Sequence, residues 1–180
     1  MKHITFIAVA MAATSIATFT FAAGSDSTAP PVKTETTQVC KDGQVWDKTI
    51  KKCLDVQGSL MTDDDIYTAA RELAYDGQYD NALKVLAVAA NQNDPRILNY
   101  KGFANRKAGR VAEGMAFYQA ALTIDPNYIL ARSYMGQGLI ADGDIAGAQA
   151  QLTEISARGG EGTWAYISLE KALNGEATTW

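Results

Sequence analysis

The chain has 180 residues and carries 16 basic and 20 acidic side chains, a formal net charge of −4 at pH 7. Mild acidity keeps a protein soluble and argues against a general binder of nucleic acid or of anionic membranes. The only histidine, His3, lies in an N-terminal segment that we expect to be removed. Without a histidine, His-dependent catalysis and His-ligated metal sites are excluded.

The N-terminal segment, residues 1–23, has the order of a secretory signal peptide. A short charged start with Lys2 precedes an apolar run, and small residues follow at Ala22 and Ala23. The competing interpretation is an uncleaved membrane anchor, because the stretch approaches the length that spans a bilayer. Its hydroxyl residues and Ala-rich end favour cleavage, and no cysteine follows closely enough for a lipoprotein anchor. We therefore expect an exported, periplasmic protein without a stable membrane anchor, with secretion as the alternative.

Residues 24–39 are rich in Ser, Thr, Pro and Ala, with hardly an aliphatic side chain. Such a segment cannot bury enough apolar area to offset its loss of chain entropy. It predicts a flexible linker. About 140 residues remain, which is the usual size of one domain.

A small hairpin is predicted over residues 40–54. Cys40 and Cys53 are the only two cysteines, and in an exported chain such close cysteines are expected to form a disulfide. Two short strands with a turn between them fit the intervening residues. A unit this small has little core, and the disulfide would contribute on the order of 3 kcal/mol. Trp46 is expected either to anchor the hairpin or to stack on a sugar ring or a partner.

The rest of the chain repeats with an offset of 34 positions, which is typical of a stacked array of similar units. Gly102 falls on Gly136 and Gly109 on Gly143, and a first unit around Gly77 follows the same pattern at a slightly shorter step. Apolar residues recur at helical spacing before and after these glycines. The sequence therefore predicts three helix pairs over residues 62–93, 94–127 and 128–160, a capping helix over residues 161–174 and a disordered tail over residues 175–180.

Capping residues indicate where the predicted helices begin. Thr62 is placed to cap the first one, with Asp65 completing a weak capping box. Asp94 is followed by a proline at the first helical position. The acidic run over residues 63–65 also suggests a calcium site, but no glycine-turned ligand loop follows it, so capping is the better explanation.

Small residues at the helix crossings indicate close packing within each pair. We expect contacts of first-helix with second-helix residues at Ala70 with Ala82, Gly102 with Gly114, and Gly136 with Ala148. Three such units bury a continuous core that none would bury alone. The expected fold is all-α, an array of antiparallel helix pairs behind a disulfide-closed hairpin.

The sequence over residues 62–157 resembles tetratricopeptide repeat proteins, most closely in the middle unit. The residues that carry the resemblance are Gly102, Gly109, Tyr118, Ala121, Leu122, Asp125 and Pro126. Departures from the family pattern are Lys101, Asn105 and Gly114. The resemblance implies a right-handed superhelical array and an adaptor that holds a peptide or another domain in its concave groove.

Two further resemblances concern the N-terminal part. The layout of signal peptide, cysteine hairpin and short array is similar to that of exported tetratricopeptide proteins of Gram-negative bacteria, which implies a role in an envelope assembly. The spacing of Cys40, Gly43, Trp46 and Cys53 resembles the hairpin of peritrophin-type chitin-binding modules and implies glycan binding. Those modules are held by further cysteines that this chain lacks.

A ligand-facing stripe is predicted on the first helix of each pair, because the first helices line the concave side of such arrays. In the middle unit it comprises Asn99, Phe103, Arg106 and Lys107, which share one helix face. Aromatic anchors around a basic centre suit an acidic or C-terminal peptide with apolar side chains. On this interpretation, Phe103→Ala abolishes partner capture and leaves thermal melting nearly unchanged. The corresponding residues of the neighbouring units are Tyr67, Arg71, Tyr75 and Gln137.

No pattern of catalytic residues is found in the sequence. The glycines recur as turns and packing points rather than as a phosphate-binding loop, and two thiolates without histidine make a poor zinc site. We therefore expect no enzymatic activity, no cofactor and no metal. The first hypothesis is an exported adaptor that binds a protein or peptide and no nucleic acid. The alternatives are a glycan- or cell-wall-binding protein acting through Trp46, and a structural array that self-associates.

Overall fold

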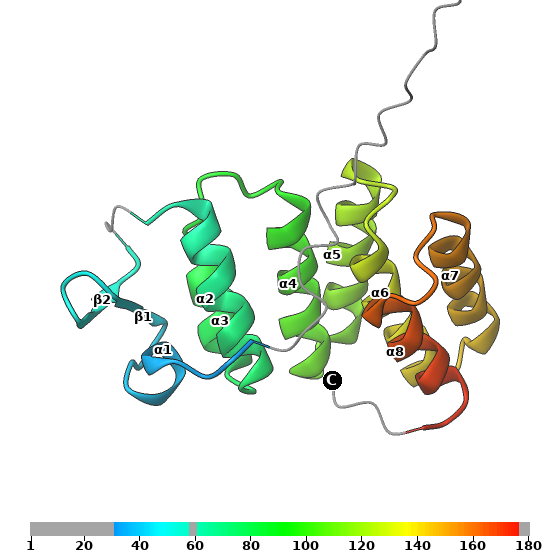
Figure 1. Cartoon of the computed structure of the whole chain (residues 1–180), viewed down its shortest axis with the longest axis horizontal. Helices are drawn as coiled ribbons and strands as arrows, with labels where there is room; N and C mark the ends of the chain where they lie inside the picture. Colours follow the sequence, from blue (N-terminus) through cyan, green and yellow to red (C-terminus); the bar gives the residue numbers. More distant parts are fainter. Residues whose placement is uncertain (1–30, 58–60, 177–180) are drawn as a thin grey trace, which may run out of the picture.

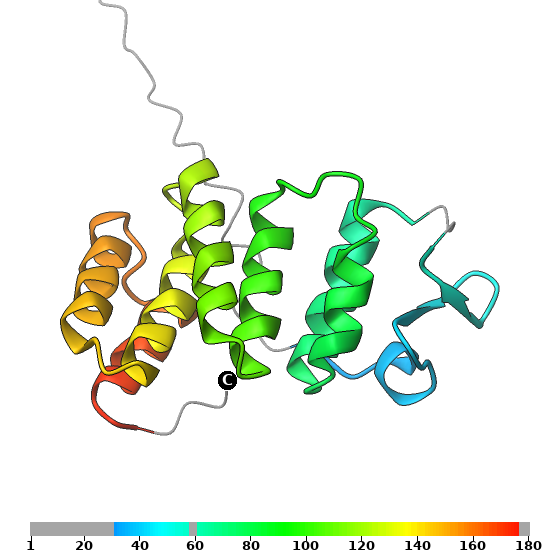
Figure 2. The same ribbon diagram turned by 180° about the vertical axis from the view of Figure 1, so that it is seen from behind.

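A computed structural model describes residues 31–57 and 61–176 of the chain. The predicted signal peptide, residues 24–30 of the predicted linker and the last four residues lie outside this part. The described residues are mostly helical, with eight helices packed in consecutive pairs and one two-stranded antiparallel hairpin. Figures 1 and 2 show the helices side by side in a row that begins at the hairpin and ends at α7 and α8. The predicted fold class is confirmed.

The hairpin consists of β1 (Gln44–Asp47) and β2 (Lys52–Asp55), with Val45 paired to Leu54. The predicted disulfide between Cys40 and Cys53 is present and joins Cα atoms 5.5 Å apart. The Asp47 carboxylate closes the turn, because it accepts hydrogen bonds from the backbone N–H groups of Thr49 and Ile50 at 2.7 and 3.2 Å. An aspartate side chain that accepts from the backbone N–H two residues later, here that of Thr49, commonly stabilises a tight turn.

The segment before the hairpin differs from the predicted flexible linker in its described part. It contains a short helix, α1 (Glu35–Gln38), capped by the Thr34 hydroxyl. The Thr34 backbone and side chain both donate to the Glu72 carboxylate, at 2.5 to 2.8 Å. The segment is ordered because Thr34 is hydrogen-bonded to Glu72, which is 38 positions away in the sequence. Local composition gives no signal of such a tertiary contact.

The array is built from α2 (Asp63–Tyr75) with α3 (Tyr79–Leu86), α4 (Pro95–Lys107) with α5 (Val111–Ile124), α6 (Ile129–Ala141) with α7 (Ile145–Ala157), and a terminal α8 (Trp164–Leu173). Thr62 and Asp65 form the predicted capping box, and Asp94 caps α4 ahead of Pro95. The turns within the pairs contain Gly77, Gly109 and Gly143 with φ of 83°, 86° and 82°. Only glycine adopts this left-handed conformation without strain, which explains its recurrence there.

The first helices of the pairs form one layer. Helix α2 contacts α4, α4 contacts α6, and α6 contacts α8, whereas α3, α5 and α7 each pack between their own partner and the next first helix. We call the layer of α2, α4, α6 and α8 the first-helix layer. The hairpin extends the array at one end, because Val45 and Val56 belong to the same buried apolar cluster as Ile66 and Leu73 of α2.

Close packing at the predicted crossing is found in the middle pair. A Cβ atom added to Gly102 would lie 2.6 Å from the Tyr118 ring, and one added to Gly114 would lie 2.8 Å from the Gly102 carbonyl oxygen. In the third unit, the atoms nearest to a Cβ on Gly136 are those of Leu169 on α8, at 2.7 Å, so the terminal helix also approaches α6 closely at this glycine.

Candidate functional site

A continuous row of aromatic rings crosses the first-helix layer. Its members are in contact from helix to helix, with ring centroids 5.5 Å apart for Tyr75 and Phe103, 4.9 Å for Phe103 and Tyr134, and 6.0 Å for Tyr134 and Trp164. Tilted and edge-on contacts at these separations stabilise aromatic pairs beyond the effect of area burial. We call this set the aromatic row: Tyr67, Tyr75, Tyr100, Phe103, Tyr134 and Trp164.

Hydrogen bonds fix the polar ends of the aromatic row. Arg71 Nε donates to Tyr100 Oη at 3.0 Å, and the hydroxyl oxygens of Tyr75 and Tyr134 lie 2.6 Å apart. Burial raises the pKa of Tyr100 and of Tyr134 well above the usual value, so both phenols are neutral at physiological pH. The row is therefore uncharged, and it is mostly buried, since Tyr100, Phe103 and Tyr134 are at most 1% exposed.

The predicted ligand-facing residues are found in two environments. Asn99 and Phe103 are 0% and 1% exposed, and Gln137 is buried with its amide donating to Ser168 Oγ at 3.1 Å. For Phe103 this corrects the prediction of a ligand anchor that can be removed without loss of stability. Phe103 lies between the rings of Tyr75 and Tyr134. The remaining predicted residues comprise Arg71, which is buried, Tyr67, Tyr75 and Arg106, which are partly exposed, and Lys107, which is exposed.

Arg106 and Lys107 place two adjacent positive charges at the end of α4. The Arg106 guanidinium lies 5.8 Å from the Phe103 ring centroid, and its Nε donates to Tyr118 Oη at 3.3 Å. Desolvation lowers the pKa of the Lys107 ammonium, and the charge of Arg106 lowers it further. A helix C-terminus favours cations, which offsets part of this repulsion.

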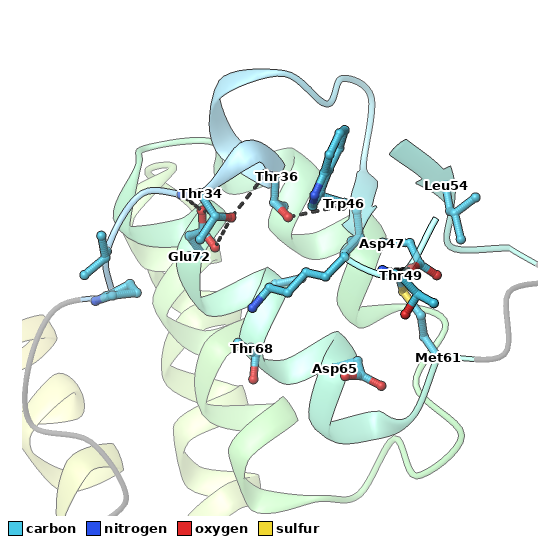
Figure 3. Close-up of a pocket in the computed structure, with 15 residues that line it drawn as sticks. Thr34, Thr36, Trp46, Asp47, Thr49, Leu54, Met61, Asp65, Thr68 and Glu72 are labelled. Carbon is cyan, nitrogen blue, oxygen red and sulfur yellow. Dashed lines mark hydrogen bonds between the residues drawn. The ribbon is translucent and has the colours of Figure 1, made fainter. Parts of the chain in front are cut away.

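A second feature, which the sequence did not predict, is a cleft of about 740 Å³ between the hairpin and α2. Figure 3 shows Trp46, Asp47 and Thr49 of the hairpin on one wall and Asp65 and Thr68 of α2 on the other. A cleft of this volume is within the range of small-molecule sites. It arises because the hairpin packs beside α2 without filling the space between them. The remaining lining residues are Pro31, Val32, Thr34, Thr36, Val45, Lys48, Leu54, Met61, Ala69 and Glu72.

One end of the cleft is rigidly held. Glu72 is 6% exposed, and its carboxylate accepts hydrogen bonds from Thr34 and from the Thr37 hydroxyl at 3.2 Å. The Thr36 hydroxyl accepts a hydrogen bond from the backbone N–H of Trp46 at 3.2 Å, which attaches the hairpin to α1 (Figure 3). The Trp46 side chain, for which we had left open an anchoring or a binding role, is partly exposed and lines the cleft.

The described residues contain no group of three or more His, Cys, Asp or Glu side chains that could hold a metal ion. Within residues 31–57 and 61–176, no helix is long and apolar enough to cross a membrane. No protein-family model, no curated protein and no solved structure matches the chain.

Substitution of Phe103 tests its structural role. We expect Phe103→Ala to lower the free energy of unfolding by about 3–5 kcal/mol, because a fully buried ring would be replaced by a cavity within the aromatic row. Phe103→Leu is the matched control, which keeps most of the volume and is expected to cost about 1.5 kcal/mol or less. Urea denaturation monitored by circular dichroism measures both. Equal stability of Phe103→Ala and the wild type would contradict the packing described here.

Proposed function

We propose that the protein is an exported, non-enzymatic adaptor that binds a peptide or protein segment along the first-helix layer. The observation that carries this proposal is the aromatic row with Arg106 and Lys107 beside it. Three rings of the row, those of Tyr67, Tyr75 and Trp164, are partly exposed and offer apolar contact area, while the buried Tyr100, Phe103 and Tyr134 lie between the first helices. The two cations add a charge preference. Aromatic and arginine side chains are the ones that contribute most to protein–protein affinity.

The chemistry of this surface favours an extended segment with an acidic group and apolar side chains. Because the tyrosine hydroxyls bond to one another or to Arg71, they hold the rings in fixed orientations before a ligand arrives. A preorganised surface loses less conformational freedom on binding, so more of the contact energy appears as affinity. The proposed array is of the tetratricopeptide type, and the N-terminal segment supports a place in a cell-envelope assembly.

Crosslinked capture from the envelope fraction of the source cells tests the proposal. We expect the wild-type chain to recover one set of proteins reproducibly, and Lys107→Glu to lose most of that recovery. The reason is that the substitution reverses an exposed charge beside Arg106 and buries nothing. Lys52→Glu makes the same charge change on the hairpin and should leave recovery unchanged. Failure of the wild type to recover any protein above a tagged control would contradict the adaptor function.

The cleft beside the hairpin favours a second candidate function, glycan or cell-wall binding. It combines the Trp46 indole with threonine hydroxyls and carboxylates at its edges. Sugar recognition commonly uses an aromatic side chain for the apolar ring face and planar polar groups for the hydroxyls, in keeping with the general make-up of ligand sites. The candidate differs from the adaptor in class and uses a different surface, so the two are separable by experiment.

Co-sedimentation with peptidoglycan or chitin tests the glycan function. If it is correct, the wild-type protein pellets with the polymer, Trp46→Ala stays in the supernatant, and Trp46→Phe, which keeps an aromatic face, retains part of the binding. Circular dichroism of each variant verifies that the array is folded. Absence of wild-type co-sedimentation, or equal binding by Trp46→Ala, would rule the glycan function out.

A further inference from the structure

The cleft between the hairpin and α2 carries more negative than positive charge. Three carboxylates line it, those of Asp47 on the hairpin and of Asp65 and Glu72 on α2, against one ammonium, that of Lys48. Asp65 and Glu72 are seven positions apart, so both lie on the face of α2 that is turned to the cleft. Asp47 lies on the opposite wall (Figure 3). A cleft with this balance of charge attracts cations and repels anions.

No cation of the described fold neutralises these three carboxylates. Within residues 31–57 and 61–176, none of them has a lysine or arginine nitrogen within 4.0 Å of its oxygen atoms. The carboxylates of Asp64, Asp80 and Asp94, in contrast, each form a salt bridge with an arginine. The carboxylates of the cleft therefore keep a charge that a ligand can use.

Neutral donors hold two of these carboxylates in place and leave one oxygen of each free. Asp47 Oδ1 accepts from the backbone N–H groups of Thr49 and Ile50. Asp65 Oδ2 accepts from the Thr62 backbone N–H and hydroxyl at 3.0 and 2.6 Å, and these hydrogen bonds lower the pKa of Asp65. Within the described residues, Asp47 Oδ2 and Asp65 Oδ1 accept no hydrogen bond. Both oxygens are therefore available to a donor of a ligand.

Glu72 contributes charge to the cleft rather than a contact for a ligand. It is 6% exposed, and its carboxylate already accepts from Thr34 and Thr37. Asp47 is partly exposed and Asp65 is exposed. A ligand therefore meets Asp47 and Asp65, while Glu72 adds to the negative potential.

Trp46 provides an aromatic surface beside these carboxylates. It carries the only aromatic ring among the described residues that line the cleft, and the ring is partly exposed. In the described part of the chain its indole takes part in no hydrogen bond and no aromatic pair. An indole face attracts an organic cation through its π electrons, and it also packs against the apolar part of the same molecule. Leu54 and Met61 add apolar side chains to the lining.

We infer that the cleft binds a small organic compound that carries a primary ammonium group on an apolar or sugar framework. The ammonium donates to Asp47 Oδ2 or Asp65 Oδ1, and the framework lies against the Trp46 indole. This inference goes beyond the adaptor function, because it concerns a different surface from the first-helix layer. For the second candidate function it implies that glycans with free amino groups bind more tightly than neutral ones. Two sources share the chemistry, namely an amino sugar and an alkyl diamine.

Isothermal titration calorimetry on the full-length mature protein tests the inference with three probes. They are the β-linked tetramer of glucosamine, its fully N-acetylated counterpart and diaminobutane, at a pH at which the amino groups are protonated. The two tetramers share a sugar framework and differ in charge, whereas diaminobutane carries ammonium groups without a sugar. We expect the glucosamine tetramer to bind at least about tenfold more tightly than the acetylated one, as a charge-assisted hydrogen bond implies. Added salt is expected to weaken the binding of the charged probes.

Variants assign the preference to the charges of the cleft. Asp65→Asn is expected to lose most of it, because the amide oxygen still accepts from Thr62 but the negative charge is gone. Asp64→Asn is the matched control, since Asp64 pairs with Arg96 and does not line the cleft, and it should leave the preference intact. Lys48→Gln removes the positive charge from the lining and is expected to raise the affinity for the ammonium probes several-fold. A purely structural role of these side chains would produce no such gain.

Thermal melting verifies that each variant is folded, and Lys48→Gln, on an exposed side chain, decides the matter if Asp65→Asn is not. If neither ammonium probe binds, or if the acetylated tetramer binds as tightly as the ammonium probes, the inference is overturned. The second of these results leaves the glycan function standing, and neither bears on the adaptor function. Weaker binding of the ammonium probes to Lys48→Gln overturns the inference as well. Binding of the glucosamine tetramer alone identifies an amino sugar as the ligand, and binding of diaminobutane alone an alkyl diamine.

Discussion

The close crossing of α4 and α5 is the constraint on which the first-helix layer depends. With no side chain on Gly102, the Tyr118 ring lies directly over the α4 backbone. With none on Gly114, the Gly102 carbonyl and the Arg106 side chain both approach α5. This approach places the Tyr118 hydroxyl where it accepts from Arg106 Nε. The position of the Arg106 side chain thus follows from two glycines, one on each of the two packed helices.

The hairpin depends on a different interaction, the buried Glu72 carboxylate of α2. Thr34 and Thr37 donate to it, and Gln78 at the start of α3 donates to the Thr37 carbonyl at 3.1 Å. Hydrogen bonds to a charged group contribute roughly 1.5–3 kcal/mol each, so this cluster holds the segment before the hairpin firmly on the array. The hairpin is attached to the array through α1 and through the buried side chain of Val45. The rest of the hairpin does not pack on α2, and the space left between them is the cleft beside Trp46.

The sequence predicted the helical array well because its signals are local. The 34-residue offset, the Asp94 cap and the glycines at the turns each act within a few residues of the structure that they specify. Exposure was not predictable in this way. Phe103 lies on the expected helix face, but rings from α2 and α6 cover it, and their positions depend on contacts across about 30 residues. The cleft and α1 were missed for the same reason, since both arise from side chains distant in sequence.

The stability of Gly114→Ala, measured by urea denaturation, tests the close crossing most directly. Helix propensity alone predicts that alanine stabilises α5 by about 1 kcal/mol relative to glycine. The contacts predict the opposite sign, because the new Cβ would meet the backbone of Gly102 and Arg106 at 2.8 and 2.9 Å, and overpacking of this kind costs about 1–3 kcal/mol. We therefore expect a variant less stable than the wild type. A gain in stability close to the propensity value would contradict the packing of α4 on α5 and the placement of Arg106 that follows from it.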